Sequence, residues 1–185
     1  MHLPTHALAS WLIGEAAGLR TRRDRTLTLC AGLVMDLDAA SLLFGPEAYE
    51  RWHRTLLHNA PTALLVTLLA FAFAGAKDGR GRAALAALLA FHGHLLCDLV
   101  GSAGPEGSIW PVPYFQPFSA VELQVAWQWP LASLQNVALT VALLVAQVFV
   151  ARRRGRTIVE ALSPRADAAV MEVIRRRFGA PVTGR

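Results

Sequence analysis

The sequence predicts an all-α, polytopic membrane protein: a helical bundle of about five hydrophobic segments followed by a short amphipathic C-terminal helical tail. Of the 185 residues, 54% are hydrophobic and 17% are charged, whereas about 25% are charged in an average soluble domain. The mean hydropathy is +0.38. The net charge of +5 could suit a nucleic-acid partner, but the basic residues fall in short blocks between apolar runs. That distribution is typical of loops flanking membrane helices, so no nucleic acid is expected as a partner.

Five apolar runs define the predicted helices, and they cover residues 5–19, 26–44, 59–76, 83–101 and 131–151. The first is short for a spanning helix, which needs about 20 residues. Residues 157–178 carry apolar positions interrupted by Ser163-Pro164 and suit short helices on a membrane surface or against the bundle. We therefore expect a membrane-embedded helical domain with the metal site over 1–151 and a basic, amphipathic cytoplasmic tail over 152–185.

The distribution of basic residues predicts the orientation. Blocks 20–25, 77–82 and 152–156 contain four, three and four Lys or Arg residues, whereas the connections 45–58 and 102–130 contain only two arginines. With five spans, the three blocks lie on one side, and the positive-inside rule makes that side cytoplasmic. The N-terminus is then expected outside and the C-terminus inside.

His94 and Asp98 are the first candidates for chemistry. They are four residues apart inside an apolar run, so a helix presents both on one face. Such a pair can bind one divalent metal ion or hydrogen-bond within the bundle. Ionisable groups within a membrane are costly and are read as functional by default.

The other candidate ligands are His6, Asp36, His53 and His58. Asp36, like His94 and Asp98, is expected near mid-membrane or in its outer half. His6 is expected at the outer end of the first segment, and His53 and His58 in or beside the first outer connection. Asp36 and Asp38 lie about 200° apart around an α-helix, so both can ligate one ion only if the helix breaks locally. Asp36 is therefore the expected ligand, and Asp38 is a second ligand, an orienting group or a general base.

Arg54 is placed between two of these histidines and could balance a phosphate or steady developing negative charge; a snorkelling role is the alternative. Glu15 and Glu122 lie in apolar surroundings and are further ligand candidates. His92 is two residues from His94 and is expected to face away from it.

The ordered motifs resemble those of the YdjM-like family, bacterial and archaeal inner-membrane proteins described as metal-dependent hydrolases. The resemblance covers about residues 3–150 and is carried by Thr5-His6-Ala7-Leu8, Met35-Asp36-Leu37-Asp38, the segment His53 to Asn59, the segment His94 to Asp98, and Pro117-Phe118-Ser119. Gln116 replaces a family Trp, and Met35 stands where the family often has the Pro that would break the helix beside the aspartates. The resemblance implies a bacterial or archaeal inner-membrane protein with a metal site.

These observations predict a membrane-bound metal-dependent hydrolase acting on a phosphoester or lipid-linked substrate through a metal-activated water. Zinc is the expected metal, since the ligands are imidazoles and carboxylates. Asp38 and Arg54 are the expected catalytic residues, and the lipid bilayer supplies both surroundings and substrate. The rival is a non-catalytic scaffold with a structural metal site whose basic tail binds a cytoplasmic protein. Metal transport is disfavoured because the inner halves of the spans are almost purely apolar.

Overall fold

The computed structural model of the chain describes residues 1–75, 77–104 and 107–179. Within these residues the secondary structure is helical, with two isolated β-bridges and no β-strand, which confirms the all-α prediction. The α-helices are α1 (Leu3–Ala16), α2 (Arg22–Leu33), α3 (Pro46–Trp52), α4 (Ala60–Phe73), α5 (Arg80–Gly101), α6 (Leu134–Arg154) and α7 (Pro164–Phe178). The 3₁₀ helices are η1 (Val34–Phe44), η2 (Lys77–Gly79) and η4 (Ile158–Ala161).

Three helical stretches in the described part of the chain are long and apolar enough to cross a membrane. They are Arg22–Phe44, Lys77–Gly101 and Leu134–Arg154, with 23, 25 and 21 residues. Helices α1 and α4 have 14 residues each, which corresponds to about 21 Å, less than the hydrocarbon core of about 30 Å. The protein is therefore a membrane protein by composition and helix length, while the count of five spans stays a prediction.

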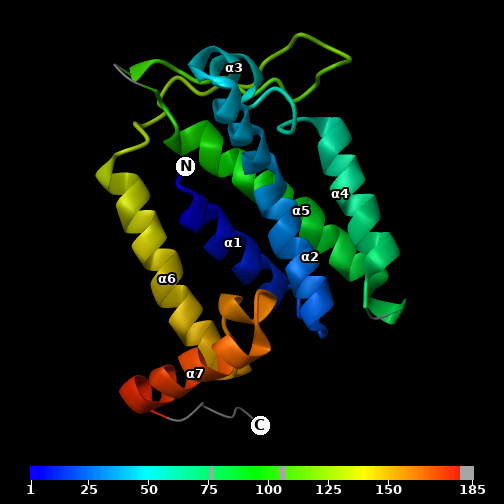
Figure 1. Cartoon of the computed structure of the whole chain (residues 1–185), viewed down its shortest axis with the longest axis vertical. Helices are drawn as coiled ribbons and strands as arrows, with labels where there is room; N and C mark the ends of the chain where they lie inside the picture. Colours follow the sequence, from blue (N-terminus) through cyan, green and yellow to red (C-terminus); the bar gives the residue numbers. More distant parts are fainter. Residues whose placement is uncertain (76, 105–106, 180–185) are drawn as a thin grey trace.

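Helix α5 is the centre of the bundle. It packs against α1, α2 and α4, and α6 packs on α1. Figure 1 shows α3 and the loops that follow α5 at one end of the bundle, with α7 at the other. The outward faces of α4 and α6 carry exposed leucines and valines, as expected for helices that contact lipid.

Gly32 allows α1, α2 and α5 to approach closely. A Cβ atom at this position would lie 1.9 Å from the Ser10 hydroxyl and 3.3 Å from the Ala90 carbonyl oxygen. Because Gly32 has no side chain, its own carbonyl comes within hydrogen-bonding distance of His94 on α5. Small residues at helix contacts are the usual means of close packing in membrane bundles.

The helix that begins at Arg22 tightens to a 3₁₀ helix at Val34, before Asp36 and Asp38. A 3₁₀ helix has about three residues per turn. Side chains two residues apart are therefore about 120° apart by the shorter way round the helix, whereas the rotation of about 200° in an α-helix leaves them about 160° apart. Long 3₁₀ runs are uncommon and often mark functional segments. This geometry allows both aspartates to reach one end of the bundle interior, although Met35 replaces the proline that breaks the helix in the family that the motifs resemble.

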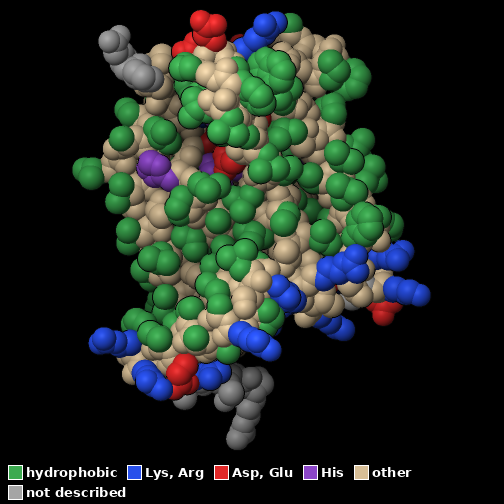
Figure 2. Space-filling model, in the orientation of Figure 1, with side chains coloured by type: hydrophobic (Ala, Val, Ile, Leu, Met, Phe, Trp, Pro, Cys, Tyr) green, Lys and Arg blue, Asp and Glu red, His purple; other side chains and the backbone are tan. Residues whose placement is uncertain are grey.

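The other end of the bundle is basic, and Figure 2 shows most of the visible Lys and Arg side chains there, below a hydrophobic flank. Glu15 is buried at this end and accepts hydrogen bonds from Arg156 at 2.7 and 3.0 Å. Arg25, also buried, lies 3.5 Å from Glu15 and donates to Glu160 at 2.6 Å. These ion pairs join α1 and α2 to the segment after α6, so Glu15 is a structural residue far from the predicted metal ligands.

We expect Glu15→Gln to lower the free energy of unfolding by about 3 kcal/mol, because removing one partner of a buried ion pair leaves charge without compensation. Glu172→Gln is the matched control: that carboxylate is half exposed, pairs with Arg176 at 2.9 Å, and should contribute less than about 0.5 kcal/mol. Denaturant unfolding of both variants in the same detergent gives the two values. Equal losses would contradict a stabilising role for the Glu15 pairs.

Candidate metal centre

Three predicted ligands converge in the bundle interior. The ligand atoms of His6 on α1 and of His94 and Asp98 on α5 all lie within 4.8 Å of one another. All three residues are buried. The imidazoles of His6 and His94 are stacked, with ring centroids 3.5 Å apart, so both rings present their edges to the same carboxylate.

The spacing between these atoms is that of ligands around a common centre. Nε2 of His6 and Nε2 of His94 each lie 3.2 Å from an Asp98 oxygen, and Nε2 of His58 lies 3.5 Å from the same carboxylate. Two zinc ligands at about 2.0–2.1 Å in a tetrahedral site are separated by about 3.4 Å. Among the described residues none of the three nitrogens has a hydrogen-bond partner. Buried polar atoms are rarely left so, and a metal ion held between them would give each nitrogen a partner.

Two of the imidazoles have their tautomer fixed by the neighbouring structure. Nδ1 of His94 lies 2.7 Å from the Gly32 carbonyl oxygen, and Nδ1 of His58 lies 2.9 Å from Asp38 Oδ2. A carbonyl or carboxylate oxygen can only accept, so each Nδ1 carries the proton and each Nε2 keeps its lone pair. Histidine ligands of metals are held by this kind of contact.

The remaining predicted ligands differ in position. Asp36 Oδ1 lies 3.7 Å from His94 Nε2, and its buried Oδ2 has no hydrogen-bond partner in the described chain. Asp36 thus borders the cluster. Nδ1 of His53 instead contacts Asp38 Oδ1 at 2.7 Å, so His53 lies on the far side of that carboxylate from His58.

Asp38 is enclosed by donors. Its Oδ1 accepts from His53 and its Oδ2 accepts from His58 and from the Arg54 backbone N–H at 2.8 Å. The side chain is fully buried. A carboxylate with both oxygens engaged is poorly placed to take a proton from a substrate or from water. The geometry therefore favours the orienting role among the alternatives that the sequence left open for Asp38.

Asp98 also receives two other donors: the Met1 amino group and the Ser102 hydroxyl contact it. These contacts hold the carboxylate at the C-terminal end of α5, where backbone carbonyls make the helix end negative. Together, the site contains two aspartates and three imidazoles whose Nε2 atoms have no hydrogen-bond partner among the described residues. This donor set suits a divalent transition metal.

Arg54 lies beside the cluster in an unusual conformation. Its φ is 69°, which lies in the left-handed region of backbone conformation. Few residues other than glycine adopt this region, and those that do are enriched at functional sites. Its guanidinium lies 4.5 Å from the centre of the Trp110 ring, and its Nη1 donates to the Trp110 carbonyl. Burial lowers the pKa of Arg54 from its ordinary value, and the charges of Asp98 and Asp38 oppose that shift. The guanidinium stays a cation.

A cavity of about 700 Å³ reaches this cluster and is called the apolar cavity here. Asp36, His53, Arg54 and Asp98 line it, and most of the rest of its wall is apolar: Met1, Ala39, Ala103, Pro130, Leu131 and Ala132. In Figure 2, histidine and acidic side chains are visible between hydrophobic side chains on the flank of the molecule. The cluster is thus reached from outside rather than sealed.

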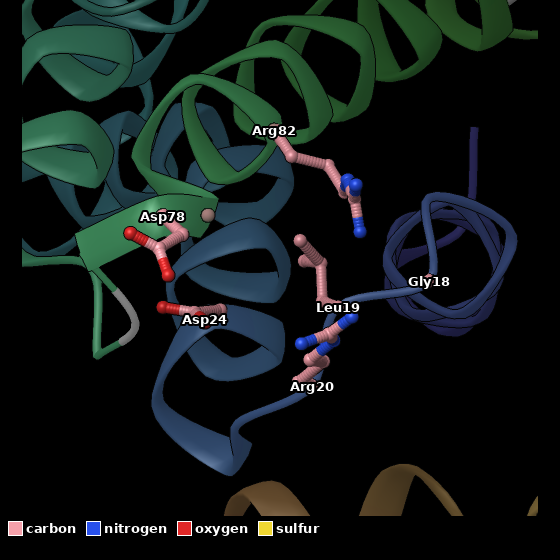
Figure 3. Close-up of a pocket in the computed structure, with 7 residues that line it drawn as sticks. Gly18, Leu19, Arg20, Asp24, Asp78 and Arg82 are labelled. Carbon is pink, nitrogen blue, oxygen red and sulfur yellow. The ribbon is translucent and has the colours of Figure 1, made fainter.

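A separate cavity of about 320 Å³ lies at the basic end. Figure 3 shows Leu19 between Arg82 and Arg20, with Asp24 and Asp78 to the left of these three side chains. The lining has no histidine, and its two positive and two negative side chains balance. This cavity therefore lacks the donor set of the metal cluster.

Sequence reasoning missed Tyr49 and Trp110 as site residues. The Tyr49 ring stacks on His53 at 4.5 Å, and the Trp110 ring meets His53 edge-on at 5.8 Å. Burial raises the pKa of Tyr49, so the phenol stays neutral. The four-residue spacing of Tyr49 and His53 was a usable signal; the position of Trp110 depends on how the long loop folds. Glu122 lies away from the cluster, in a second cavity.

The helices and the site define an integral membrane protein with a buried histidine–carboxylate cluster that could hold a metal ion. The chain matches the model of the YdjM inner membrane protein family over residues 1–176. It therefore belongs to that family, which confirms the resemblance drawn from the motifs. No curated protein and no solved structure matches the chain.

Proposed function

We propose that the protein is a membrane-bound metal-dependent hydrolase of a phosphoester or lipid-linked substrate. One observation carries the proposal: the imidazole nitrogens of His6, His58 and His94, without hydrogen-bond partners in the described chain, meet the Asp98 carboxylate beside an open cavity. Structural metal sites are closed by protein ligands, whereas catalytic sites keep a position for water or substrate. The access to Asp36 and Asp98 from the apolar cavity favours catalysis over a structural role.

The contacts of each residue indicate its role in the proposed reaction. His6, His94 and Asp98 would hold the ion, with His58 and Asp36 beside them. A bound zinc ion would polarise a phosphoryl oxygen and lower the pKa of water. Asp36 lines the cavity, and its Oδ2 has no hydrogen-bond partner among the described residues, so it would accept a proton from water there. Arg54, which lines the same cavity, would bind the negative charge of the substrate.

The surroundings of the site support a lipid or lipid-linked substrate. The cavity wall is mainly apolar, and the basic blocks lie at the other end of the bundle (Figure 2). Under the positive-inside rule the basic end is cytoplasmic. The cluster would then face the outer half of the inner membrane, and the tail from residue 152 would lie on the cytoplasmic side.

The test is turnover of a labelled panel of phospholipids and polyisoprenyl phosphates by detergent-purified protein. We expect hydrolysis of at least one class, loss of hydrolysis after chelation, and recovery when zinc is added back. His6→Ala should be inactive throughout. The alternative outcome is a protein that retains bound metal, hydrolyses no class and melts at a lower temperature after chelation. That outcome would instead support the scaffold whose basic tail binds a cytoplasmic protein.

A further inference from the structure

A second cavity, of about 550 Å³, adjoins the apolar cavity and is called the polar cavity here. Both are lined by the same four residues: Tyr49, His53, Arg54 and Trp110. The polar cavity adds four polar side chains to this shared wall: Glu50, Thr55, Ser108 and Glu122. Two compartments of different chemistry therefore meet at the residues that border the metal cluster.

Arg54 is the charged group at this junction. It is only 6% exposed, and its Nε has no acceptor within the described residues. The backbone N–H is held by Asp38 and the guanidinium is held against Trp110. A buried cation with a free donor at the boundary of two cavities is suited to an anionic group that passes from one cavity into the other.

The side chains that the polar cavity adds to the shared wall carry negative charge, opposite in sign to Arg54. Glu50 and Glu122 are exposed carboxylates on its lining. A second anionic group in this cavity would be repelled, whereas a positively charged group would be attracted. The apolar cavity offers the side chains of Ala39, Leu131 and Ala132 as contacts for hydrocarbon.

We propose that the substrate is an amphiphilic phosphodiester with a cationic headgroup. Its hydrocarbon part occupies the apolar cavity, its phosphate lies at Arg54, and its amine lies in the polar cavity near Glu50 and Glu122. The amine-bearing phosphodiester is the recognised unit, whether it belongs to a glycerophospholipid or to another lipid. The inference rests on the proposed hydrolase function and specifies the substrate class of that site.

The experiment compares phosphatidylethanolamine and phosphatidylglycerol with identical acyl chains, presented in competition to full-length protein in a neutral detergent. For each headgroup, native mass spectrometry counts the bound lipid together with any bound hydrolysis product. A lipid that is hydrolysed in the site therefore still counts as recognised. We expect the ethanolamine lipid to be preferred about fivefold, as two exposed carboxylates would provide. Glycerophosphoethanolamine, which has no acyl chains, should compete poorly, whereas an amine-bearing polyisoprenyl phosphodiester should compete well if the lipid part is interchangeable.

The variants separate the parts of the proposal. The double change Glu50→Gln and Glu122→Gln should remove the headgroup preference and retain lipid binding, while Arg54→Gln should weaken both lipids about tenfold. Glu47→Gln, on the same helix α3 but outside the lining of either cavity in the described structure, is the control and should retain the preference. Equal binding of the two lipids by the unmodified protein, or a preference that survives the double change, would overturn the inference.

Failure of the inference can be told apart from failure of the hydrolase proposal. Selective binding of the ethanolamine lipid without hydrolysis in the presence of zinc would leave recognition intact and refute the enzyme. Zinc-dependent hydrolysis that ignores headgroup charge would leave the enzyme intact and refute recognition.

Discussion

His94→Ala should reduce the metal content of the purified protein to background. His94 contributes a lone pair on Nε2 because its Nδ1 proton is committed to the Gly32 carbonyl oxygen, and it lies 3.2 Å from Asp98 and 3.7 Å from Asp36. Removing it takes away the ligand that links the two carboxylates. Elemental analysis after extensive buffer exchange measures the metal bound per chain.

His92→Ala is the matched control. It lies on the same helix, two residues away, and its ring contacts the Leu88 carbonyl oxygen and the Tyr114 hydroxyl, both at 2.8 Å. The variant should therefore keep the metal. Circular dichroism and melting of both variants exclude misfolding as the cause of a loss, and His6→Ala tests the cluster from a different helix. Metal retained by His94→Ala, or lost equally by His92→Ala, would contradict the assigned centre.

The helical fold could be predicted because apolar runs between basic blocks leave a membrane chain few alternatives. The number of spans could not be derived in the same way. Helix α1 has 14 residues, and whether so short a segment crosses the membrane depends on tilt and on shielding by its neighbours. The periodicity of apolar residues in the sequence carries no information about helix tilt or about shielding by neighbouring helices.

The pairing of His94 with Asp98 could be predicted because it is local: four residues on one helix fix their relative position. The partners of Asp38 could not, because they come from a loop that returns 15 to 20 residues later. The change to a 3₁₀ helix at Val34 was also hidden, since no proline stands there and Gly32, two residues earlier, lies inside α2. The positive φ of Arg54 likewise follows from tertiary contacts and not from residue type.

Asp38→Asn should weaken metal binding about 10- to 100-fold without abolishing it, the usual result of losing a group that orients a ligand. An amide has one acceptor oxygen, so it can serve His53 or His58 but not both, and its NH₂ group would face a donor. If the oxygen is kept by His53, the His58 ring loses the contact that directs its Nε2 towards Asp98. Competition with a chelator of known affinity gives the change in the dissociation constant.

The same variant decides between two of the three roles that the sequence allowed for Asp38, the orienting group and the general base. A general base would lose turnover at saturating zinc while metal affinity stayed unchanged, whereas an orienting residue loses affinity first and regains much of its turnover when zinc is raised. Ser41→Ala is the control: its hydroxyl donates to the Asp38 backbone carbonyl at 2.6 Å and leaves the carboxylate untouched. Since both Asp38 oxygens are already occupied by donors from His53, His58 and Arg54, the loss of affinity is the expected result.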